Sequence, residues 1–140
     1  MKRILFVCHG NICRSPMAEF IMKKMVKDAG REDEFEIASA ATSTEELGNP
    51  VYPPARRKLA EHGIRCDGKR ARQLTWEDYD HYDMLIGMDD ANIRNMHRMC
   101  GGDPEDKIRK LLPRDVADPW YTDDFDATWR DCVEGCRKLL

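Results

Sequence analysis

Residues 2–20 read KRILFVCHGNICRSPMAEF, and three kinds of segment follow one another there. The continuous apolar run at 4–7 predicts a buried strand of a parallel sheet. A helix is expected over 16–29, because it opens with proline and then repeats apolar residues at helical spacing. Between the two lies a loop, residues 8–15, which begins with cysteine and ends with arginine and serine.

This loop has what is needed to bind an oxyanion. A tight strand-to-helix turn directs backbone N–H groups inward, and the helix N-terminus adds partial positive charge. Gly10 and Asn11 tolerate the backbone angles of such a turn, and Arg14 can hold two oxygens of a phosphate. The same environment favours the thiolate of Cys8, to which Ser15 can donate a hydrogen bond. A thiolate beside a bound phosphate is a nucleophile facing an electrophile.

The string CHGNICRSP at residues 8–16 resembles the signature loop of the low-molecular-weight protein tyrosine phosphatase family, which also lies close to the N-terminus. The resemblance implies that Cys8 is the nucleophile and that Arg14 clamps the phosphate. The phosphate-binding residues that it implies are His9, Gly10, Asn11, Ile12, Cys13, Arg14 and Ser15.

A thiolate can attack phosphorus, but the leaving oxygen needs a proton from an acid outside this loop. Asp118 precedes Pro119, which restricts its conformation, and it lies between the last predicted strand and the last predicted helix. We expect that segment at the same end of the sheet as the first loop. The resemblance assigns Asp118 as general acid and later base, with Trp120 and Tyr121 as aromatic residues of the cleft.

The resemblance also implies supporting roles. Asn11 and Ser15 support the loop and the thiolate, Ser39 is the expected hydrogen-bond partner of Asn11, and Asp89 buttresses the site. It further implies that the cysteine pair 8 and 13 is redox-active: Cys13 would capture an oxidised Cys8 as a reversible disulfide.

Three residues depart from the family pattern. Many relatives carry histidine where Lys69 stands, and some carry a cleft tryptophan where Glu45 stands. His9 is unusual beside the nucleophile, and we place it with Glu45 in the substrate cleft. The substrate preference of those relatives therefore does not transfer to this chain.

Further strands are predicted over 35–41, 83–88 and 108–112, and further helices over 54–62, 76–78, 89–99 and 124–140, with a long loop at 42–54. Strands that alternate with helices indicate an α/β fold: one domain, 1–140, with a doubly wound four-stranded parallel sheet and helices on both faces. By resemblance this fold is phosphotyrosine phosphatase I-like. Ligands of such sheets bind beyond the carboxyl ends of the strands, where the first loop lies.

Composition narrows the class of protein. The net charge of −3 does not indicate a nucleic-acid or membrane-surface binder, and no segment is long and apolar enough to span a bilayer. The run at 4–7 is too short for a signal peptide, so we expect a cytoplasmic protein with reduced thiols. The six cysteines form no Cys-x-x-Cys pair, so neither zinc nor another cofactor is expected. We take Cys132 and Cys136 as core residues, and a monomer as the default.

The function predicted is hydrolysis of phosphotyrosine, in proteins and in small aryl phosphates, through a phosphocysteine on Cys8. A thiol-dependent arsenate reductase on the same fold would need two further cysteines, but residues 87–89 are Gly-Met-Asp. A protein arginine phosphatase would carry threonine where Ile12 stands. A phosphate-binding module without catalysis would need neither Cys8 nor Asp118, and a redox sensor would not need Asp118.

Overall fold

The computed structural model describes all residues, 1–140, and its strands form one parallel sheet in the order β2-β1-β3-β4. The strands are β1 (Lys2–Cys8), β2 (Phe35–Ala41), β3 (Met84–Gly87) and β4 (Ile108–Lys110). Every strand pair is parallel, with Ile4 opposite both Ile37 and Met84. The predicted doubly wound, four-stranded parallel sheet is confirmed.

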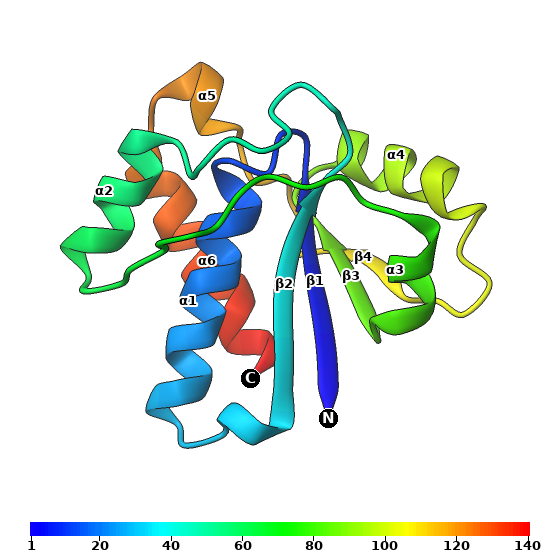
Figure 1. Ribbon diagram of the computed structural model, residues 1–140, viewed down its shortest axis with the longest axis horizontal. Coiled ribbons are helices and arrows are strands. Elements are labelled where there is room, and N and C mark those ends of the chain that lie inside the picture. Colours follow the sequence, from blue (N-terminus) through cyan, green and yellow to red (C-terminus); the bar gives the residue numbers. More distant parts are fainter.

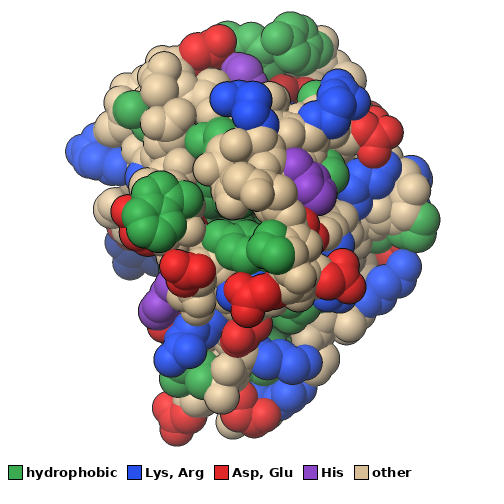
Figure 2. All heavy atoms as spheres, turned by 90° about the vertical axis from the view of Figure 1, so that its right-hand side faces the viewer, with side chains coloured by type: hydrophobic (Ala, Val, Ile, Leu, Met, Phe, Trp, Pro, Cys, Tyr) green, Lys and Arg blue, Asp and Glu red, His purple; other side chains and the backbone are tan.

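Helices cover both faces of this sheet, with α1, α2 and α6 on one side and α3 and α4 on the other (Figure 1). The helices are α1 (Arg14–Asp28), the 3-10 helix η1 (Glu32–Glu34), α2 (Pro53–Glu61), α3 (Trp76–His81), α4 (Asp90–Cys100), α5 (Pro119–Thr122) and α6 (Phe125–Leu139). No helix combines the length and apolar character needed to cross a bilayer. Acidic and basic side chains are interspersed on the face that carries α3 and α4 (Figure 2).

The two covered faces explain why the run in β1 is apolar at every position. Ile4 and Phe6 belong to the core under α1 and α6, whereas Leu5 and Val7 belong to the core under α3 and α4. A strand buried on both sides has no solvent-facing position to fill with a polar residue. Cys132 and Cys136 are fully buried in the first core, as predicted.

Most element boundaries agree with the predictions to within a few residues. Strand β2 spans the predicted 35–41, and Asp89 caps α4 by accepting a hydrogen bond from the N–H of Asn92. Strand β4 is shorter than the predicted 108–112. Leu111 leaves the strand and packs against Gly135 of α6, where an added Cβ would lie only 2.3 Å from Leu111 Cγ.

Two elements were not predicted: the 3-10 helix η1, which is three residues long, and the helix α5. Residues 119–122, expected as loop, form the short helix α5, which Asp118 caps. Four residues are too few to display helical periodicity, although a capping aspartate before a proline is a helix-start signal.

Candidate active site

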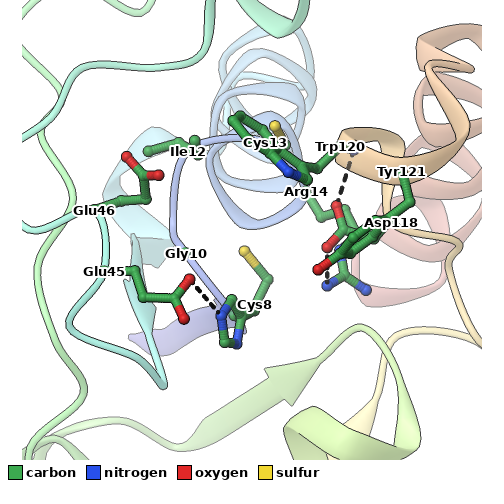
Figure 3. A pocket seen from close by; sticks show the side chains of 11 residues that line it. Cys8, Gly10, Ile12, Cys13, Arg14, Glu45, Glu46, Asp118, Trp120 and Tyr121 are labelled. Atoms are coloured by element: carbon green, nitrogen blue, oxygen red, sulfur yellow. Dashed lines mark hydrogen bonds and ion pairs between the residues drawn. The ribbon is translucent and has the colours of Figure 1, made fainter.

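The loop between β1 and α1 lies at the carboxyl edge of the sheet (Figure 1). There it forms the bottom of a cavity (Figure 3). The cavity is lined by Cys8, His9, Gly10, Ile12, Cys13, Arg14, Glu45, Glu46, Asp118, Trp120 and Tyr121. We call Cys8, Asn11, Arg14 and Ser15 the floor, and His9, Glu45, Glu46, Trp120 and Tyr121 the rim. Floor and rim thus bring residues from both ends of the chain to one place.

Hydrogen-bond donors converge on the sulfur of Cys8, which is 3% exposed. The Ser15 hydroxyl lies 3.0 Å from Sγ, and the backbone N–H groups of Asn11 and Ser15 point at it from 3.3 and 3.4 Å. Such donors stabilise negative charge on the sulfur, as an attacking or a departing thiolate requires.

Asn11 holds the loop in shape. Its φ of 59° lies in the left-handed region, which asparagine tolerates better than most residues. Its amide nitrogen donates to the hydroxyls of Ser15, at 2.7 Å, and Ser39, at 2.9 Å, while its side-chain oxygen accepts from the backbone N–H of Arg72 at 3.2 Å. A buried residue with these bonds cannot turn away without leaving polar groups unpaired.

A buried ion pair continues this network behind the loop. The Ser39 hydroxyl donates to Glu19 of α1 at 2.5 Å, and Lys69 donates to the Ser39 carbonyl at 3.0 Å. The Lys69 ammonium also lies 3.5 Å from Glu19, whose other oxygen pairs with Lys23 at 2.6 Å. Burial lowers the pKa of Lys69, and the nearby Glu19 carboxylate partly opposes that shift. Lys69 therefore supports the loop through Glu19 and Ser39.

Glu19 lies in the predicted helix 16–29 but was not among the predicted site residues. A signal was available, because Glu19 follows Ser15 by four residues and so lies on the same face of α1.

Arg14 is 2% exposed and has three partners. One terminal nitrogen donates to Asp89 at 2.7 Å and to the carbonyl of Val116 at 2.9 Å, and the other lies 3.3 Å from the carboxylate of Asp118. Burial acts to lower the pKa of Arg14, but the charges of Cys8, Asp89 and Asp118 outweigh it, and the pKa is raised. The guanidinium therefore stays charged and oriented.

Asp118 reaches the cavity from the start of α5. One carboxylate oxygen accepts from the N–H of Trp120 at 3.1 Å, and the other faces Arg14 (Figure 3). The ring of Trp120 packs on Tyr52 with 4.9 Å between ring centroids. Tyr121 is 83% exposed, so the aromatic side of the rim is open to solvent.

The opposite side of the rim is polar. His9 Nε2 lies 3.0 Å from a carboxylate oxygen of Glu45, and Glu46 accepts a hydrogen bond from the side chain of Asn49 at 2.6 Å. Glu46 also packs over Gly10, where an added Cβ would meet its Cγ at 3.4 Å. Glu46 was not singled out in the sequence, where it is one more acidic residue of a polar loop.

All six cysteines are free thiols, and only Cys8 and Cys13 line the cavity. Burial raises the pKa of the Cys13 thiol strongly, and the negative charges of Cys8 and Asp118 add to this. Nowhere do three or more histidine, cysteine or acidic side chains converge as a metal site would need.

The arrangement sets a thiol, a guanidinium and a carboxyl around one anion-sized recess. Comparison with known proteins agrees with the family resemblance of the loop. A family model described as low molecular weight phosphotyrosine protein phosphatase matches residues 3–140. The chain belongs to this family.

Relatives of this phosphatase family match the chain over nearly its whole length. The low molecular weight protein-tyrosine-phosphatase YfkJ of Bacillus subtilis is 37% identical over 147 residues, covering 100% of this chain and 94% of YfkJ. The YfkJ crystal structure has a TM-score of 0.96 and covers 99% of this chain and 92% of that one. A low molecular weight protein tyrosine phosphatase from Streptococcus pyogenes is 41% identical, with a TM-score of 0.93 and coverages of 100% and 91%. An arginine phosphatase from Drosophila is 28% identical, with a TM-score of 0.90 and coverages of 99% and 95%.

Four residues that the family resemblance singled out do not line the cavity: Asn11, Ser15, Ser39 and Asp89. Asn11 and Ser15 contact the Cys8 sulfur from within the loop. Ser39 lies behind the loop, where it contacts Asn11, and Asp89 contacts Arg14 from the start of α4. Two further contributors are backbone atoms, the carbonyl of Val116 and the N–H of Arg72. Any side chain can accompany such a backbone atom, so sequence carries no signal for them.

Proposed function

We propose that this low molecular weight phosphatase hydrolyses phosphotyrosine in proteins, and small aryl phosphates, through a phosphocysteine on Cys8. One observation carries the proposal: Cys8, Arg14 and Asp118 face the same cavity, with Arg14 3.3 Å from Asp118. The nucleophile, the anion clamp and the proton donor required for phosphoryl transfer are thus together.

In the first step the Cys8 thiolate attacks phosphorus and forms the S–P bond. The bond from phosphorus to the tyrosine oxygen breaks, and Asp118 gives its proton to that oxygen. Arg14 and the N–H groups of the loop hold the equatorial oxygens, whose charge must be matched in the transition state.

In the second step Asp118, now a carboxylate, takes a proton from water while the water oxygen bonds to phosphorus. The S–P bond breaks and the sulfur leaves as thiolate, which the Ser15 hydroxyl at 3.0 Å can stabilise. Phosphate departs, and Asp118 is protonated again for the next cycle. These steps use only side chains and backbone groups of this chain, and the proposal assigns no cofactor.

Two features support an aryl phosphate as substrate. One is Ile12, where a protein arginine phosphatase would carry threonine, and the other is the aromatic side of the rim. Trp120 and Tyr121 can pack against the tyrosine ring. An arsenate reductase is less well supported, because no cysteine besides Cys8 and Cys13 lines the cavity. The proposal includes a cytoplasmic monomer without nucleic-acid or membrane partners, and six free thiols suit a reducing compartment.

The test is release of p-nitrophenol from p-nitrophenyl phosphate, with a metal chelator present. We expect the parent to be active and Cys8→Ser to lose at least about 10³-fold in kcat, because a serine hydroxyl is a far weaker nucleophile than a thiolate. Cys100→Ser changes a thiol far from the cavity and should keep the parent rate. An inactive parent, or an active Cys8→Ser variant, would contradict the proposal.

We further propose that Cys13 protects Cys8 during oxidation. Peroxide converts the Cys8 thiolate to sulfenic acid; the Cys13 sulfur then attacks, a disulfide forms and water leaves. After peroxide treatment, mass analysis should find a Cys8–Cys13 crosslink, and a dithiol should restore activity. Cys13→Ala should lose activity irreversibly under the same treatment. Full recovery of Cys13→Ala, or a parent without the crosslink, would remove Cys13 from this role.

A further inference from the structure

The charges around the cavity are unevenly compensated. Asp118 is opposed by Arg14, and Glu45 is opposed by His9 when that ring is protonated. Glu46 has no cation within ion-pair distance, and its one side-chain hydrogen bond comes from the neutral amide of Asn49. The rim therefore carries a negative charge without a cationic partner, above the floor that contains Arg14.

A peptide substrate has to cross this rim. With the phosphate held by Arg14 and the loop N–H groups, the tyrosine ring of a substrate would occupy the cavity, which Trp120 lines together with Glu45 and Glu46 of the 42–52 loop (Figure 3). Consecutive residues of an extended peptide are about 3.3–3.6 Å apart, so the neighbours of the phosphotyrosine lie over the rim itself. A cation there would meet Glu46 and Glu45, and an anion would be repelled by them.

We propose that the rim selects phosphotyrosine flanked by lysine or arginine, with Glu46 as the main specificity determinant and Glu45 as its partner. This rests on the proposed function and adds the sequence context of the substrate. The cation belongs to a residue next to the phosphotyrosine, because a phosphoarginine would bring its guanidinium into the cavity itself, where Arg14 already lies.

The test compares phosphotyrosine peptides that differ only in both flanking residues: lysine, alanine or glutamate. At low salt we expect kcat/KM to be about ten-fold higher for the lysine than for the glutamate peptide, with most of the difference in KM. The ratio should shrink in about 0.5 M salt, which screens exposed charges. A phosphoarginine peptide with neutral flanks should react more slowly than its phosphotyrosine counterpart.

Variants test which side chain causes the preference. The readout is the ratio of kcat/KM for the lysine peptide to kcat/KM for the glutamate peptide, because a general change of activity affects both values equally. Glu46→Gln should reduce the ratio to about three, and Glu46→Lys should invert it. Glu77→Gln removes the same charge from exposed α3, outside the cavity, and should leave both the ratio and the activity unchanged.

A lysine-to-glutamate ratio near one in the parent would overturn the proposal. So would an unchanged ratio in Glu45→Gln/Glu46→Gln, or a higher kcat/KM for the phosphoarginine peptide than for the phosphotyrosine peptide. Activity on p-nitrophenyl phosphate separates these outcomes from a failure of the proposed function, since only the latter abolishes it.

Discussion

The floor and the rim of the cavity both carry polar side chains but hold them differently. On the floor, Asn11 and Arg14 are 1% and 2% exposed, and each holds three hydrogen bonds to protein groups. On the rim, the side chains of His9 and Glu45 are 47% and 68% exposed and share one contact. Buried, fully bonded groups are preorganised for a developing charge, whereas exposed pairs contribute little to stability. We therefore expect substitutions on the floor to change the rate of the reaction and substitutions on the rim to change the choice of substrate.

The largest effect should come from breaking the floor at Arg14. Arg14→Ala removes the anion clamp and leaves Asp89 and Asp118 without their cation, so we expect kcat/KM on p-nitrophenyl phosphate to fall by about 10³-fold. Arg14→Lys keeps the charge but loses the planar fork, and should retain more activity than the alanine variant. Urea unfolding of each variant separates lost chemistry from lost stability. Near-parental kcat/KM in a folded Arg14→Ala would contradict the assignment.

Asp118 lies where floor and rim meet, and its loss should be nearly as severe. Asp118→Asn can still accept from the N–H of Trp120 but cannot supply a proton, so kcat/KM, which reports the first step alone, should drop about 10²–10³-fold on phenyl phosphate. The drop should be smaller on p-nitrophenyl phosphate, whose leaving group needs less protonation. Competitive inhibition by inorganic phosphate should persist. Equal losses on both substrates would assign Asp118 to binding rather than proton transfer.

The network behind the floor should have a smaller effect, visible mainly in stability. Lys69→Met leaves Glu19 with Lys23 as its only cation, and we expect a loss of about 2 kcal/mol in the free energy of unfolding. A several-fold lower kcat should accompany it, as Ser39 and Asn11 become less ordered.

A double-mutant cycle identifies the cause of that loss. Glu19→Gln/Lys69→Met has no buried charge left to compensate, so urea unfolding should find it less destabilised than the sum of the two single variants. Additive single effects would mean that Glu19 and Lys69 act independently.

The contrast between floor and rim also explains what could be predicted from the sequence. The β1 strand, the loop and α1 were predictable because an apolar run, a glycine-containing turn and a proline follow one another within 2–20. Glu46 was not predicted, because only tertiary packing brings it over Gly10. The sequence places Glu19 on the same helix face as Ser15, but only tertiary packing shows that it contacts Ser39. Helix α5 was not predicted, because its four residues are too few to show helical periodicity.

The phosphocysteine is the most direct test of the account. Asp118→Asn should still be phosphorylated by p-nitrophenyl phosphate, whose leaving group departs readily, but should lack the base that activates water. Acid quenching followed by intact-mass and peptide analysis should then find one phosphoryl group, on Cys8, and none in Cys8→Ser/Asp118→Asn. A phosphoryl group on another residue, or none in an Asp118→Asn enzyme that still releases p-nitrophenol, would contradict the account.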